Sequence, residues 1–127
     1  MNRLLAASAL ATTLCATAAR GDDARFTFQA AEFLDEDRAR AAGLAWAQTQ
    51  LPPGLPLADA VGRAKTAGMT CRPPRPPGGD VRCRYSMVVH KPGGIIGEDN
   101  FILELAPDAS GRLRQARLVY NRDGVPE

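Results

Sequence analysis

Two cysteines and a single histidine are the residues of this chain best suited to chemistry. Cys71 and Cys83 flank a proline-rich stretch, and the third cysteine, Cys15, lies in the N-terminal segment. The C-x-x-C spacing of thiol-exchange enzymes is absent, and two cysteines with one histidine are too few for a closed metal site. We therefore expect Cys71 and Cys83 to form a structural disulfide, contributing about 3 kcal/mol to stability, and we expect no bound metal.

His90 is the only histidine, so it would have to be the general base of any Ser-His or Cys-His site. After the N-terminal segment the only serines are Ser86 and Ser110, and neither lies in a G-x-S-x-G sequence. The glycine-rich residues 93–97 lack the Gly-Lys-Ser/Thr ending of a phosphate-binding loop. These observations predict a protein without catalytic residues or a cofactor.

The charges are distributed unevenly along the chain. Residues 22–37 are mainly acidic, whereas seven residues between Arg63 and Lys91 are basic and only Asp80 is acidic. Two interpretations remain open: oppositely charged faces that keep a small domain in solution, or a basic patch that binds an acidic partner or anionic lipid. The formal net charge of +2 does not suggest a nucleic-acid partner.

Ile95 and Ile96 are unusual for a glycine-rich connection. They either fold back onto the core or form part of a contact surface. Together with the basic residues they define the candidate partner surface, which consists of Arg72, Arg75, Arg82, Arg84, Lys91, Ile95 and Ile96.

The N-terminal residues 1–18 have the pattern of a secretory signal peptide. Arg3 precedes an apolar stretch, and Ala16-Thr17-Ala18 is a cleavage site of the A-x-A type. We expect cleavage near Ala18 and a periplasmic or secreted product. Thr12-Thr13-Leu14 before Cys15 does not match a lipobox, so anchoring through Cys15 is not expected.

The remaining chain has the periodicity of an α+β domain. A helix is expected over residues 30–50, beginning near Leu34, and a second over 56–67 with Leu55 as its N-cap. Alternating patterns predict strands over 81–90, 99–106 and 113–120, with an irregular loop over 71–79 and a connection over 91–98. The predicted fold is two helices packed on a three-stranded antiparallel sheet in the order α-α-β-β-β, with one disulfide. The expected domain spans residues 34–122, between a loosely ordered lead-in over 19–33 and a tail over 123–127.

Three segments resemble small bacterial envelope proteins. They are Leu51-Pro52-Pro53-Gly54-Leu55-Pro56 followed by Ala67-Gly68-Met69-Thr70-Cys71, then Cys83-Arg84-Tyr85, and Asp108-Ala109-Ser110-Gly111-Arg112-Leu113. In this respect the chain is similar to SmpA/OmlA/BamE-like lipoproteins and to β-lactamase-inhibitor-protein-like domains. The resemblance implies a non-enzymatic binding domain: one family supports outer-membrane β-barrel assembly and the other blocks a secreted enzyme.

The combined expectation is an exported binding or scaffold module of the bacterial envelope, with an envelope or secreted protein as its partner. The alternatives are an inhibitor of a secreted hydrolase and a protein that binds anionic lipid or a small ligand. Membrane contact is expected only through anionic lipid or lipidation.

Overall fold

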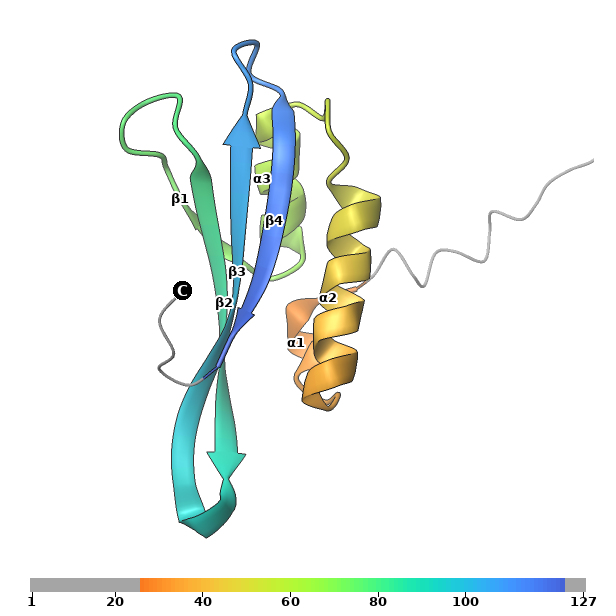
Figure 1. Ribbon diagram of the computed structural model, residues 1–127, viewed down its shortest axis with the longest axis vertical. Coiled ribbons are helices and arrows are strands. Elements are labelled where there is room, and N and C mark those ends of the chain that lie inside the picture. Colours follow the sequence, from red (N-terminus) through yellow and green to blue (C-terminus); the bar gives the residue numbers. More distant parts are fainter. Residues whose placement is uncertain (1–25, 123–127) are drawn as a thin grey trace, which may run out of the picture.

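A four-stranded antiparallel sheet carries all of the helices on one face (Figure 1). The computed structural model describes residues 26–122, so the expected signal peptide, residues 19–25 of the lead-in and the C-terminal tail lie outside the described residues. The elements are α1 (Phe28–Ala31), α2 (Glu36–Gln50), α3 (Leu57–Thr66), β1 (Thr70–Arg72), β2 (Val81–Lys91), the 3-10 turn η2 (Pro92–Gly94), β3 (Ile95–Pro107) and β4 (Leu113–Asn121). The predicted α+β class and antiparallel meander are confirmed.

The sheet has four strands in the order β1-β2-β3-β4, so the prediction of three strands is wrong. The additional strand, β1, lies within the stretch that was expected to be irregular from Cys71 onward. It pairs with β2 through Thr70↔Arg84, Cys71↔Cys83 and Arg72↔Arg82. The prolines begin only at Pro73, so they leave the three residues of β1 free to form backbone hydrogen bonds.

The predicted first helix is two helices, because the chain turns at Asp35. This residue has extended backbone angles (φ −68°, ψ 168°), and its Oδ1 accepts a hydrogen bond from the Arg38 amide at 2.9 Å. Asp35 is thus the N-cap of α2, an arrangement that satisfies one of the free amides at a helix start. Phe33, which falls inside the predicted helix over residues 30–50, lies in the turn before Asp35 and is 89% exposed.

The start of α3 is stabilised by backbone from the β3–β4 turn. Pro56 occupies the N-cap position and makes no side-chain cap, so the expectation that Leu55 is the N-cap is wrong. The Leu57 amide donates to the Gly111 carbonyl at 3.0 Å, and the Leu113 amide donates to the Leu55 carbonyl at 2.7 Å. A carbonyl distant in sequence therefore takes the role usually filled by a Ser, Thr or Asp side chain.

The core lies between the helices and the sheet and is centred on aromatic rings. Phe28 is fully buried, with ring centroids 5.2 Å from Trp46 and 4.8 Å from Phe101. Helix α2 reaches this cluster through Gly43, where an added Cβ would lie 3.0 Å from Phe101 Cε1. No helix of the described residues is long and apolar enough to cross a membrane.

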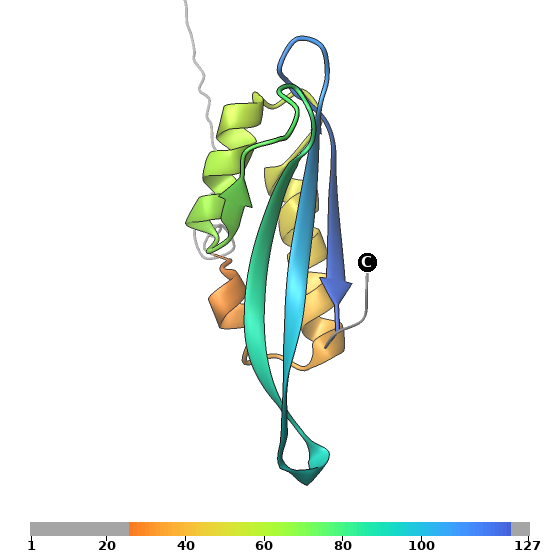
Figure 2. The ribbon, with the colours of Figure 1, turned by 90° about the vertical axis from the view of Figure 1, so that its left-hand side faces the viewer.

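Strands β2 and β3 continue beyond the body of the molecule as a two-stranded arm. The expected connection over residues 91–98 is reduced to Pro92–Gly94, and Gly93 and Gly94 take the left-handed φ values (+84° and +78°) that glycine tolerates. Strand β4 stops opposite Asn100, so within residues 26–122 the segment 88–98 pairs only with itself. The arm projects past the helices in both views (Figures 1 and 2).

Candidate functional site: the open sheet face and the hairpin arm

Three of the predicted surface residues meet on the sheet face that the helices leave open. Arg72 lies directly opposite Arg82 across the β1–β2 pair. Arg84 follows Arg82 by two residues on the same strand, and side chains at that spacing point to the same face, roughly 7 Å apart. The exposed side chains of Arg72, Arg82 and Arg84 therefore form a compact group, which we call the arginine cluster.

The arginine cluster contains like charges in direct cross-strand opposition, a pairing that destabilises a sheet. Arg72 and Arg84 form no ion pair with any residue among 26–122. The same row of the sheet continues from Arg82 to Glu104 and then to Arg117, whose Nη1 lies 2.6 Å from Glu104 Oε1. The excess positive charge is thus concentrated at the β1–β2 edge of the face.

The Cys71–Cys83 disulfide holds this edge together. The two cysteines are directly opposed on β1 and β2, with Cα atoms 3.9 Å apart, and Cys83 is completely buried on the face toward the helices. The bridge ties a strand of only three residues to its neighbour and so fixes Arg72 beside Arg82. A disulfide of this kind is typical of proteins outside the cytoplasm.

The other predicted surface residues do not join the arginine cluster. Arg75 lies exposed in the loop between β1 and β2, while Lys91, Ile95 and Ile96 lie at the end of the arm. His90, opposite Ile96, is six residues along β2 from Arg84, which corresponds to roughly 20 Å of strand. The sequence thus identified two separate features as one surface.

The arm carries exposed apolar side chains on both of its faces. Ile96 is 66% exposed and lies on the same side as Val88, which is 64% exposed. Ile95 is 60% exposed and lies on the opposite side. Neither isoleucine folds back onto the core, so that alternative is wrong, and the contact surface stays a prediction.

The hydroxyl groups of Tyr85 and Tyr120 form hydrogen bonds that hold parts of the fold together. The Tyr85 hydroxyl donates to Glu32, and burial together with this acceptor raises the pKa of Tyr85 to about 12. The Tyr120 hydroxyl donates to Asp99 Oδ2 at 2.7 Å, and burial followed by this hydrogen bond raises its pKa as well. Among residues 26–122 no three His, Cys, Asp or Glu side chains are grouped to hold a metal ion.

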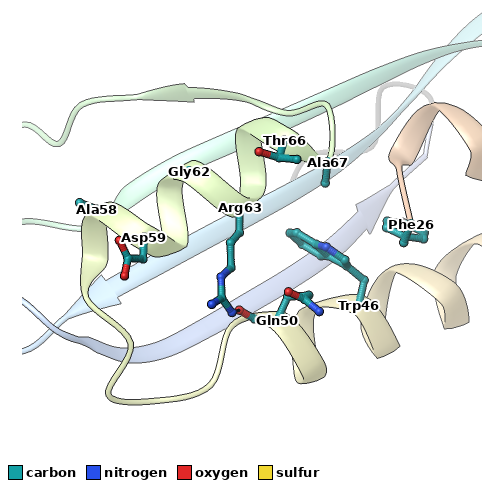
Figure 3. A pocket seen from close by; sticks show the side chains of 9 residues that line it. All are labelled: Phe26, Trp46, Gln50, Ala58, Asp59, Gly62, Arg63, Thr66 and Ala67. Carbon is teal, nitrogen blue, oxygen red and sulfur yellow. Dashed lines mark hydrogen bonds between the residues drawn. The ribbon is translucent and has the colours of Figure 1, made fainter. Parts of the chain in front are cut away.

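A cleft of about 410 Å³ opens between α2 and α3, on the helical side of the sheet (Figure 3). Trp46 from α2 and Arg63 from α3 point into the space between the two helices. The lining residues are Phe26, Trp46, Gln50, Ala58, Asp59, Gly62, Arg63, Thr66 and Ala67. Sequence periodicity did not reveal this cleft, because it depends on how two helices pack side by side.

No protein-family model, curated protein or solved structure matches the chain.

Proposed function

We propose that this chain is a protein-binding module that works outside the cytoplasm and binds an acidic surface of its partner through the arginine cluster. The single observation that carries the proposal is the direct opposition of Arg72 and Arg82 on a strand pair closed by a disulfide. Arg72 and Arg84 form no ion pair among residues 26–122, so their guanidinium groups retain donors for a carboxylate-rich partner. Arginine suits this role because its planar guanidinium binds carboxylates in a bidentate manner.

An acidic protein fits the open face better than an anionic membrane does. Glu104 lies on the same face as the arginine cluster, where it is paired with Arg117, so this face carries charges of both signs rather than positive charge alone. A protein surface can place acidic groups opposite Arg72 and Arg84 and polar groups opposite the Glu104–Arg117 pair, whereas a lipid surface presents one sign of charge throughout. Such complementarity of mixed charges provides specificity.

The experiment is photo-cross-linking in the organism that produces the protein. A photoreactive residue replaces Thr70, which is exposed and lies opposite Arg84. Cross-links to a partner protein are expected, and Arg72→Ser/Arg84→Ser should abolish them. The matched control, Arg38→Ser/Lys65→Ser, removes two exposed charges from the helices and should leave the cross-links unchanged.

Equal cross-linking in both double variants would contradict the proposal. Sedimentation with vesicles of anionic lipid tests the other source of negative charge. Vesicle binding that is lost in Arg72→Ser/Arg84→Ser, with no protein cross-link, would replace the acidic protein with a membrane surface.

The hairpin arm favours a second candidate function, inhibition of a secreted hydrolase. A narrow two-stranded arm with exposed Ile95 at its end can enter a concave active site, and the resemblance to inhibitor domains points the same way. The purified protein would be assayed against a panel of extracellular hydrolases. Inhibition that is lost in Ile95→Asp but retained in Arg72→Ser/Arg84→Ser would support this candidate and separate it from the first.

A further inference from the structure

The indole N–H of Trp46 has no hydrogen-bond partner among the described residues. The residue is 7% exposed, and the structure records no hydrogen bond from its indole N–H to any of residues 26–122. A buried donor left unsatisfied costs roughly 1–3 kcal/mol, and such groups in folded proteins call for a physical explanation. Because Trp46 lines the cleft between α2 and α3, an acceptor bound in that cleft would provide one.

Arg63 places a fixed cation beside this donor. Its side chain crosses from α3 to α2, where Nη1 donates to the Gln50 carbonyl at 2.7 Å (Figure 3). Asp59, one helical turn earlier, forms no ion pair with Arg63 among the described residues. A guanidinium has five N–H groups, so an anchored Arg63 retains donors for an anionic acceptor without having to be ordered first.

Aromatic rings form the apolar part of the cleft. The ring centroids of Phe26 and Trp46 are 5.9 Å apart with an interplanar angle of 30°, and Phe28 supports Trp46 from the core. In Figure 3 Asp59 lies at the end of the cleft away from Trp46, with Arg63 between them. Repulsion from Asp59 would direct a negative group toward the end where Arg63 and Trp46 lie.

We propose that this cleft binds a small organic carboxylate with a flat apolar body. The carboxylate accepts hydrogen bonds from Arg63 and from the indole N–H of Trp46, and the apolar body packs against Phe26 and Trp46. A volume of about 410 Å³ is at the lower end of the range of ligand pockets, which suits a small molecule or the last residue of a peptide. The site lies on the opposite side of the sheet from the arginine cluster and does not depend on the proposed function.

The test uses Trp46 itself, since it is the only tryptophan of the chain. The intact protein is titrated with 3-phenylpropionate and, separately, with its amide, and both Trp46 fluorescence and the NMR signal of the indole N–H are followed. We expect a saturable change with the acid and at least about tenfold weaker binding of the amide, since the loss of one charge-assisted pair has this magnitude. Equal binding of acid and amide, or no saturable change with the acid, would overturn the proposal.

Substitutions on α3 test whether Arg63 and Asp59 act on the bound carboxylate as proposed. Arg63→Met should weaken binding of the acid about tenfold, whereas Asp59→Asn should strengthen it and Lys65→Met, the matched control on α3, should leave it unchanged. A loss of affinity in Lys65→Met as large as that in Arg63→Met would overturn the assignment. If Arg63→Met fails to fold, the comparison of acid with amide on the wild-type protein still decides the proposal.

A free small molecule and the C-terminus of a peptide can both present a carboxylate beside an apolar group, and a further titration distinguishes them. N-acetyl-Ala-Phe is compared in its free-acid and amidated forms under the same conditions. Tighter binding of the free-acid peptide than of 3-phenylpropionate identifies a peptide C-terminus as the ligand. The reverse order identifies a free small molecule.

Discussion

Gly43 is a point of close contact between α2 and the sheet. A Cβ at this position would lie 3.0 Å from Phe101 Cε1 and 3.1 Å from Leu118 Cδ2. We expect Gly43→Ala to lower the free energy of unfolding by about 1–3 kcal/mol, the usual cost of overpacking a core, although alanine is the better helix former. Urea denaturation followed by Trp46 fluorescence measures this change.

The control for Gly43 is Gly62, a glycine of α3 at which an added Cβ meets nothing within 4 Å. Gly62→Ala should stabilise the protein by roughly 0.5–1 kcal/mol through helix propensity alone. Two Gly→Ala changes in helices are therefore expected to have opposite signs. Stabilisation by both would show that α2 can move away from the sheet without loss of packing.

Tyr85 makes stability sensitive to alkaline pH. Its pKa is about 12 in the folded protein, against about 10 in an unfolded chain, so the folded state favours the neutral phenol. This contribution is complete below about pH 10 and is lost as the pH rises from there through about 12. The difference in the free energy of unfolding between the wild type and Tyr85→Phe should therefore shrink over that window, as measured by urea denaturation at several pH values. A constant difference would contradict the role assigned to Tyr85.

At the scale of elements, we expect the pairing of β1 with β2 to depend on the Cys71–Cys83 disulfide. Strand β1 has three residues and pairs only with β2. We expect Cys71→Ser/Cys83→Ser to lower the free energy of unfolding by about 3 kcal/mol, because the unfolded chain gains the freedom of the closed loop. Amide exchange should accelerate in residues 70–72 more than in the central strand β3. Unchanged exchange in β1 would show that the strand pairs with β2 without the bridge.

The sequence predicted the elements whose patterns are local and missed those that depend on distant contacts. The alternation of apolar and polar residues identified β2, β3 and β4, although it placed Ile95–Glu98 in a connection rather than in a strand. The existence of β1 requires Cys71 to lie opposite Cys83, a partner twelve residues away. The cap of α3 requires Gly111, which is brought to Leu57 only by the completed sheet.

The same distinction applies to the candidate sites. The arginines were recognisable because Arg82 and Arg84 stand two apart on a predicted strand, and Arg72 joins them through the pairing of β1. Their distance from Ile95 and Ile96 was not predictable, since the extended strands carry the isoleucines to the far end of the arm. The cleft at Trp46 and Arg63 was missed because no local pattern reports the distance between two helices.

At the scale of the whole molecule, the hairpin arm should be the part that opens most readily. Two-stranded hairpins without further packing are marginally stable in water, and residues 88–98 have no third strand beside them in the described part of the chain. In hydrogen exchange monitored by NMR, the amides of this segment should be much less protected than those of 101–105, where β3 lies between β2 and β4. Equal protection would mean that the arm is as stable as the body.

The exposed edge of strand β4 affects how readily copies of this protein aggregate with one another. Strand β4 is one of the two edge strands of the sheet among the described residues, and its nine positions contain Arg114 and Arg117 but no acidic residue. An exposed strand edge is a template on which a second chain can add, and repeated addition leads to fibrils. Two copies of β4 paired antiparallel in the register that places residue 114 opposite residue 117 would oppose arginine with arginine. The edge therefore carries its own protection against aggregation, and crowded solutions of this protein should resist edge-to-edge growth as long as these two charges are present.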